Sequence, residues 1–119
     1  MINIFVYGTL KRGFYNNDLL KSSLFIADAI TKEKYPMVNV ESFFPYLIND
    51  KGHGTHVKGE LFKTDVKTLE NIDELEGYPD LYTREFITII SLGIEISAIV
   101  YFVKDVINYS NLELLEEFS

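Results

Sequence analysis

The sequence predicts a single domain that combines several short β-strands with one clear α-helix. The chain has 119 residues, which is an ordinary size for one domain. Apolar residues make up 47% of it, enough for one substantial core. Short runs rich in Ile, Val, Phe and Tyr favour strands, whereas residues 64–76 have the periodicity and end signals of a helix. No repeat or linker divides residues 1–119, so one domain is expected throughout.

The expected strands follow the apolar runs in chain order. They cover residues 2–7, 24–31, 37–40, 46–49 and 56–62, and the last two are expected to pair across the glycine-rich turn 50–54. Residues 86–103 are mostly apolar, but Glu95 and Gly93 interrupt them. We therefore expect two buried strands joined at 91–93 rather than a membrane-spanning helix. A short helix is expected at 17–22. A second one is expected at 109–118, with Leu112 and Leu115 facing inward.

The helix at 64–76 carries a carboxylate where its pattern predicts an apolar residue. Thr64 or Asp65 can cap its start, Gly77 can end it, and Pro79 prevents continuation. The side chains Val66, Leu69, Ile72 and Leu75 form the expected buried stripe. Glu76 falls near the middle of that stripe, at ~280°, and Asp73 near its edge, at ~340°.

Three interpretations of Glu76 follow from its position. Because it lies in the last helical turn, its side chain could simply reach solvent. It could instead form a structural ion pair with Arg84. In the third interpretation it is a general base, since an apolar pocket raises the pKa of a carboxyl group toward neutrality. Helical periodicity does not decide among the three.

A second candidate element is the turn after the first strand, Tyr7-Gly8-Thr9-Leu10. A glycine at a strand end permits a sharp turn that leaves backbone N–H groups pointing outward. Such a group of donors suits a carboxylate or an oxyanion. The segment is neither a dinucleotide-binding nor a P-loop motif, and many turns of this type have no ligand.

Composition excludes several classes of function. Cysteine is absent, which rules out disulfides, thiolate catalysis and iron–sulfur clusters and fits a cytoplasmic protein. A net charge of −7 makes nucleic-acid binding unlikely on electrostatic grounds. The N-terminus has no signal-peptide pattern, and no membrane partner is expected.

His53 and His56 have no third ligand nearby, so we expect a solvated turn rather than a metal site, and no serine hydrolase motif is present. Phe43, Phe44 and Tyr46 are expected to fill the core.

The charges are distributed unevenly along the chain. Residues 1–59 carry seven Lys and Arg against five Asp and Glu, whereas residues 60–119 carry four against thirteen. If the halves pack together, a basic patch around Lys11 and Arg12 would suit a small anionic ligand. The alternative is ordinary scattered, solvated charge.

Two motifs together resemble one protein family. The segment FVYGTLKRG at residues 5–13 is similar to the N-terminal signature of the gamma-glutamylcyclotransferase-like (AIG2-like) proteins. DELEGYP at residues 73–79, followed by Tyr82 and Arg84, resembles their second signature, and GELF at 59–62 matches the strand before the helix. The resemblance covers about residues 2–104. The segment YPMV at 35–38 and the Lys-Arg-Gly ending of the first motif resemble the gamma-glutamylamine cyclotransferase branch.

The resemblance implies an α+β fold, a small mixed β-barrel flanked by a few short helices. It implies that the Tyr7, Gly8, Thr9 and Leu10 loop holds a gamma-glutamyl group through backbone amides and that Glu76 is the acid/base. Tyr82, Arg84 and Tyr101 match shared positions, for which we expect a structural role. The implied reaction converts a gamma-glutamyl amine or a gamma-glutamyl amino acid to 5-oxoproline and a free amine by intramolecular aminolysis, without a metal or organic cofactor. Two rival functions are a non-catalytic small-molecule binding protein on this fold and removal of a gamma-glutamyl protecting group from a biosynthetic intermediate.

Overall fold

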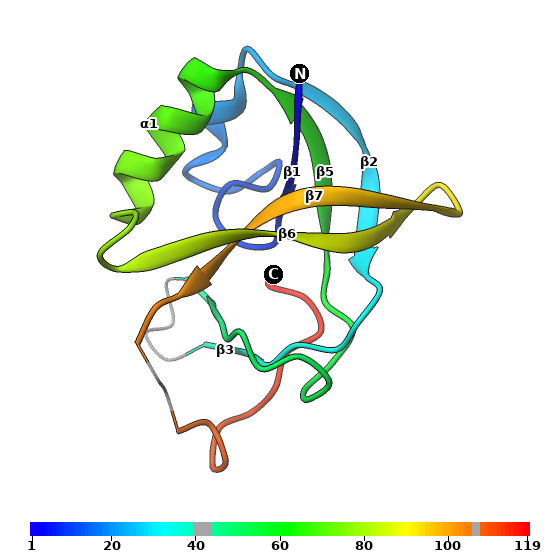
Figure 1. The fold of residues 1–119 in the computed structure, drawn as a ribbon, viewed down its shortest axis with the longest axis vertical. Helices are drawn as coiled ribbons and strands as arrows, with labels where there is room; N and C mark the ends of the chain where they lie inside the picture. Colours follow the sequence, from blue (N-terminus) through cyan, green and yellow to red (C-terminus); the bar gives the residue numbers. More distant parts are fainter. Residues whose placement is uncertain (40–43, 106–107) are drawn as a thin grey trace.

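Five strands close into a barrel with one α-helix packed on its outside (Figure 1). The computed structural model describes residues 1–39, 44–105 and 108–119. The strands are β1 (Ile2–Val6), β5 (Lys58–Thr64), β2 (Leu24–Thr31), β6 (Tyr82–Ser91) and β7 (Ile94–Val103), in that order around the barrel. β1 runs parallel to β7, and the other neighbours are antiparallel. The expected mixed β-barrel is therefore confirmed.

The alternation of side chains along β1 places two hydrophobic cores on either side of the barrel wall. Phe5 belongs to the cluster inside the barrel, whereas Ile4 and Val6 belong to the cluster between the wall and α1 (Val66–Glu76). This follows from the strand geometry, since successive side chains point to opposite faces. β1 is therefore buried on both faces, and the turn that follows it starts from a fixed position.

Helix α1 has the predicted caps but a narrower buried face than predicted. The Asp65 carboxylate accepts the Thr68 N–H at 2.7 Å, and Gly77 ends the helix in the left-handed conformation at φ 69°. Leu69 and Ile72 are buried, as predicted. The end residues of the predicted stripe, Val66 and Leu75, are 62% and 44% exposed.

The predicted hairpin between residues 46–49 and 56–62 is wrong. β4 (Tyr46–Leu47) pairs instead with β3 (Met37–Val38) in a separate two-stranded sheet. β5 lies between β1 and β2 in the barrel. The glycine-rich segment between β4 and β5 instead pairs back to Tyr35 through a bridge at Thr55. Val40, the predicted end of the 37–40 strand, lies outside the described residues. The β6–β7 hairpin is confirmed, with its turn at Leu92 and Gly93.

The predicted helix at 109–118 is also wrong, whereas the predicted helix at 17–22 is a short 3₁₀ helix, η1 (Asn17–Leu20). Residues 114–118, near the end of the chain, form an extended strap that lies beneath the barrel (Figure 1). Its backbone groups bond to the body of the protein rather than within a helix, since Leu115 N–H donates to Met37 and Lys58 N–H donates to Glu116. Leu115 packs against the core as expected, but Leu112 is exposed.

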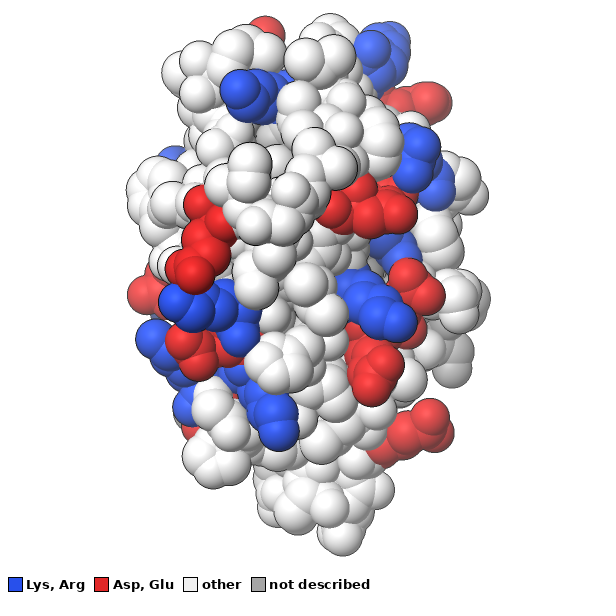
Figure 2. All heavy atoms as spheres, turned by 90° about the vertical axis from the view of Figure 1, so that its right-hand side faces the viewer, with Lys and Arg blue, Asp and Glu red and all other residues white. Residues whose placement is uncertain are grey.

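The predicted basic patch around Lys11 and Arg12 is not present. Lys11 is only 6% exposed. The Arg12 guanidinium is 3.2 Å from the Glu60 carboxylate and 3.7 Å from that of Asp28. On the face drawn in Figure 2, basic and acidic side chains are interspersed. No helix among the described residues is long and apolar enough to cross a membrane.

Candidate active site

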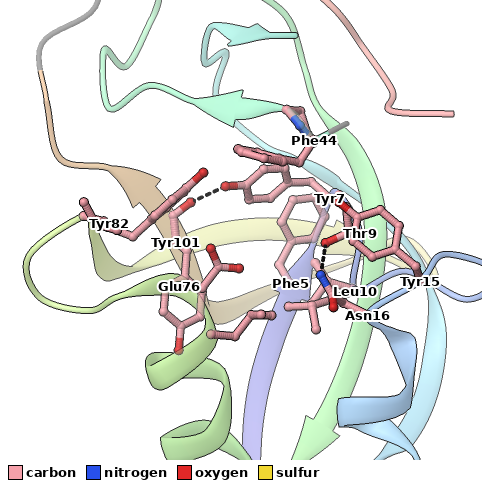
Figure 3. Close-up of a pocket in the computed structure, with 15 residues that line it drawn as sticks. Phe5, Tyr7, Thr9, Leu10, Tyr15, Asn16, Phe44, Glu76, Tyr82 and Tyr101 are labelled. Carbon is pink, nitrogen blue, oxygen red and sulfur yellow. Dashed lines mark hydrogen bonds between the residues drawn. The ribbon is translucent and has the colours of Figure 1, made fainter. Parts of the chain in front are cut away.

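A cavity of about 300 Å³ lies where the end of β1 meets the last turn of α1 (Figure 3). All five residues predicted for the site line it: Tyr7, Gly8, Thr9, Leu10 and Glu76. The remaining lining residues are Phe5, Val6, Tyr15, Asn16, Phe44, Pro45, Leu75, Leu81, Tyr82 and Tyr101. The fold thus brings together two motifs that are more than 60 residues apart in the sequence.

The Glu76 carboxylate points into this cavity from the end of α1 (Figure 3). Its surroundings are mostly apolar and aromatic, and burial raises the pKa of Glu76 from 4.5 to about 7. The side chain is only partly exposed, and it faces this cavity rather than the open surface. A carboxyl group with this pKa can both accept and donate a proton near neutral pH.

The structural ion pair expected as one alternative exists, but Asp73 forms it instead of Glu76. The Arg84 Nε lies 3.5 Å from an Asp73 carboxylate oxygen, and the Tyr101 hydroxyl donates to the same oxygen at 2.6 Å. Tyr101 is also linked to the loop after β1, because the Tyr7 hydroxyl donates to the Tyr101 backbone carbonyl at 2.7 Å. Asp73 is one helical turn before Glu76, so these contacts fix the part of α1 that presents the Glu76 carboxylate.

The loop after β1 is held by hydrogen bonds that involve Lys11 and Asn16. Lys11 N–H donates to the Gly8 carbonyl at 3.1 Å and closes the turn. Asn16 donates from its side-chain amide to the Thr9 hydroxyl and from its backbone N–H to the Thr9 carbonyl, at 2.9 and 3.0 Å. Among the described residues, no protein acceptor is found for the N–H groups of Gly8, Thr9 and Leu10. These donors stand at the cavity wall, where they can bind an anionic oxygen.

Three tyrosines also line the cavity: Tyr7 at the start of the loop, and Tyr82 and Tyr101 from β6 and β7. Burial raises the pKa of Tyr7, Tyr82 and Tyr101 well above the usual range, and the negative charge of Glu76 adds to this effect in each case. All three phenols therefore stay neutral at physiological pH. The hydroxyl groups of Tyr7 and Tyr101 are engaged in the hydrogen bonds described above.

The two histidines of the sequence are engaged away from this cavity. His53 Nδ1 lies 3.2 Å from the Asp50 carboxylate, and His56 Nδ1 lies 3.2 Å from the Thr31 carbonyl. Within the described residues, no group of three or more potential ligand side chains could hold a metal ion.

Some lining residues had no signal in the sequence. Tyr15, Asn16, Pro45 and Leu81 come from loops without periodicity. Phe44, expected in the core, is partly exposed and lines the cavity, Tyr46 is partly exposed on β4, and Phe43 lies outside the described residues. Asn16 was detectable in principle, because Asn often bonds nearby backbone groups in turns.

Comparison with known proteins agrees with this geometry. The family described as "Gamma-glutamyl cyclotransferase, AIG2-like" matches residues 4–118, and the chain belongs to this family. It is 46% identical over 102 residues to the Methanocaldococcus jannaschii protein named "Putative gamma-glutamylcyclotransferase MJ1514", covering 83% of this chain and 82% of that protein. It is 45% identical over 89 residues to gamma-glutamylaminecyclotransferase A of Danio rerio, covering 70% of this chain but only 55% of that relative.

Solved structures show the same fold. The crystal structure of an AIG2-like protein from Mus musculus superposes with a TM-score of 0.92 at 30% sequence identity. The match covers all of this chain and 88% of the mouse chain. The barrel, the helix and the strap are therefore a known arrangement.

Proposed function

We propose that this protein converts a gamma-glutamyl amine to 5-oxoproline and a free amine, with Glu76 as the acid/base. The observation that carries this proposal is the carboxyl group of Glu76, which has a pKa of about 7 and lies in the same cavity as the loop amides. Family membership supports a gamma-glutamyl substrate.

The reaction is an intramolecular aminolysis. The alpha-amine of the gamma-glutamyl group attacks its own side-chain carbonyl carbon, and a five-membered lactam forms. Because both groups belong to one molecule, the enzyme mainly has to hold the folded-back conformation. The amine attacks only after its ammonium form loses a proton, which Glu76 accepts. The bond to the leaving nitrogen then breaks as Glu76 returns that proton to it. The attacking nitrogen loses a second proton as the lactam forms, and the released amine takes up a proton from solvent.

The loop amides have a separate role in this scheme. The N–H groups of Gly8, Thr9 and Leu10 bind an anionic oxygen, either the substrate alpha-carboxylate or the oxygen that becomes negative in the tetrahedral intermediate. Because the donors are backbone groups in a fixed turn, little reorganisation accompanies binding.

The charge of the cavity favours an amine over an amino acid as the leaving group. Among the described lining residues, Glu76 is the one acidic side chain, and none is Lys, Arg or His. The carboxylate of a leaving amino acid would therefore lack a cationic partner and would be repelled by Glu76. Relatives named gamma-glutamylaminecyclotransferase, from Danio rerio and Homo sapiens, support the same choice.

The experiment that tests the proposal measures 5-oxoproline release from gamma-glutamyl amines, gamma-glutamyl dipeptides and glutathione. Gamma-glutamyl amines are expected to be turned over fastest, and EDTA is expected to leave the rate unchanged because aminolysis needs no metal. Folded protein that released no 5-oxoproline from any of these compounds would favour the non-catalytic alternative.

We expect Gly8→Val to lower activity more than Thr9→Ala does. A β-carbon at Gly8 would lie 3.1 Å from two ring carbons of Pro45, so the branched valine would push the loop away from the cavity wall. Thr9→Ala removes one hydrogen bond from Asn16 and keeps the backbone donor. The measurement is kcat/KM for one gamma-glutamyl amine. If Gly8→Val kept the wild-type kcat/KM while Thr9→Ala lost activity, substrate binding would depend on the Thr9 hydroxyl instead of the loop backbone.

The raised pKa of Glu76 predicts an unusual dependence of stability on pH. Since the pKa is about 7 in the folded protein against an ordinary 4.5, the native state binds the proton more tightly than the unfolded state. The contribution of Glu76 to the free energy of unfolding is therefore largest below pH 4.5 and is lost as the pH rises toward and through 7. The loss is at most about 3 kcal/mol.

The Glu76→Gln variant isolates this contribution. Its melting temperature is expected to equal that of the wild type near pH 5 and to exceed it at pH 8, because the amide never carries the buried charge. Glu74→Gln, on the exposed face of α1, serves as the control and is expected to show no such divergence. A difference that stayed constant between the two pH values would contradict the raised pKa.

A further inference from the structure

Lys11 is a buried cation that the proposed reaction does not use. It lies in the same loop as Gly8 and Leu10, yet it does not line the cavity. It is 6% exposed. An ammonium group is seldom buried to this degree unless it is paired. Its contacts therefore show what it does for the loop.

The contacts of Lys11 link the loop to the strap near the end of the chain. Its ammonium group donates to the backbone carbonyl of Phe118 and lies 5.0 Å from the centre of the Phe14 ring. The rings of Phe14 and Phe118 are 5.4 Å apart. The negative charge of Glu117 acts on the ammonium group and partly offsets the cost of burial. Lys11 thus bridges the loop and residues 114–118, which we call the strap.

The strap is itself fixed to the rest of the fold. Leu114 forms a β-bridge with Val38, the Leu115 carbonyl accepts the Thr55 hydroxyl at 2.9 Å, and Phe118 is buried in the barrel-interior core. The Phe118 carbonyl is therefore a stationary anchor for the Lys11 ammonium group. Because the Lys11 N–H closes the turn on the Gly8 carbonyl, fixing the Lys11 side chain also fixes the turn.

We propose that Lys11 is a positioning residue for substrate binding, through which the strap holds the loop amides of Gly8, Thr9 and Leu10 in the orientation that binds substrate. This inference rests on the proposed function. It assigns a role to the Lys-Arg-Gly part of the first motif and to the strap, neither of which touches the cavity. This inference assigns the loop amides to the substrate alpha-carboxylate rather than to the tetrahedral oxyanion. Loss of the anchor therefore raises KM and leaves kcat nearly unchanged, because the proton transfers depend on Glu76, which belongs to another element.

The test uses Lys11→Met, an unbranched side chain one atom shorter than Lys that lacks its charge and donors. With gamma-glutamyl propylamide as the probe, we expect KM to rise about tenfold or more, as small displacements of binding groups typically cause, with kcat within about threefold of wild type. Lys21→Met, at an exposed lysine, is the control. Lys11→Arg is expected to recover part of the loss, since a guanidinium can also donate to the Phe118 carbonyl.

Binding without turnover separates this inference from the proposed function. Calorimetry with the same probe compares Glu76→Gln with the double variant Glu76→Gln/Lys11→Met. Binding by the first and about tenfold weaker binding by the second would support the anchor. Equal binding would overturn the anchor alone, and no binding by either protein would overturn both proposals.

A second variant covers the case in which Lys11→Met does not fold. Phe118→Ala keeps the backbone carbonyl but removes the ring that packs on Phe14, so the strap loosens around its anchor point. We expect the same rise in KM with kcat preserved, at a temperature where the variant is folded. A lowered melting temperature with unchanged KM would show that the strap only stabilises the fold and would overturn the proposal.

Discussion

The Glu76→Gln variant is expected to release 5-oxoproline about 10²–10⁴-fold more slowly than the wild type, the range that general acid–base catalysis usually contributes. The amide keeps the shape of the side chain but cannot accept the proton of the substrate ammonium group. Substrate binding is expected to persist because the loop amides of Gly8–Leu10 are untouched. The measurement is the initial rate with the best gamma-glutamyl amine found, together with the affinity for that compound.

Glu74→Gln is the matched control for this prediction. It makes the same chemical change on the same helix, two residues away and on the exposed face, and its rate should stay near that of wild type. A Glu76→Gln rate within a few-fold of wild type would remove Glu76 from the mechanism. Loss of activity through unfolding is not expected, since the structural pair with Arg84 belongs to Asp73.

Glu76 and the loop could be predicted from the sequence because each has a local signal. The period of α1 is set by hydrogen bonds within the helix. A carboxylate on its apolar face can therefore be recognised from the sequence without knowing which residues pack against that face. The glycine after β1 marks a turn for a similar reason. The role of Asp73 in α1 was harder to predict from the sequence, because its partners Arg84 and Tyr101 come from β6 and β7.

The errors in the predicted fold concern contacts between distant segments. The pattern of residues 58–64 identifies a strand, but its pairing with β1 and β2 depends on burial against residues 28 to 62 positions away. Residues 109–118, which include the strap, were predicted as a helix because Leu112 and Leu115 have helical spacing. The backbone of the strap instead bonds to Met37, Thr55 and Lys58, and these tertiary bonds outweigh a weak local preference.

One glycine of the GELF segment connects the barrel to the site. Gly59 in β5 lies against the end of β1, where a β-carbon would overlap the Val6 carbonyl oxygen and approach two Phe5 ring carbons to 2.7 and 2.9 Å. The backbone of β5 can therefore reach β1 only if residue 59 has no side chain. Because Val6 immediately precedes the Tyr7–Leu10 loop, this close approach also sets where the loop begins.

Gly59→Ala is accordingly expected to lower the free energy of unfolding by about 3 kcal/mol, the upper part of the usual range for overpacking. The Val6 carbonyl belongs to the backbone and the Phe5 ring is fully buried, so neither can move aside easily. The measurement is urea denaturation, with kcat/KM taken at a temperature where the variant is folded. We expect kcat/KM to fall as well, because displacement of Val6 moves the loop amides.

Gly93→Ala is the control: its β-carbon meets nothing within 4 Å but its φ is 75°, so it should cost only about 1 kcal/mol of backbone strain. If Gly59→Ala were no more destabilising than Gly93→Ala, the close packing of β5 on β1 would not be what holds the loop in place.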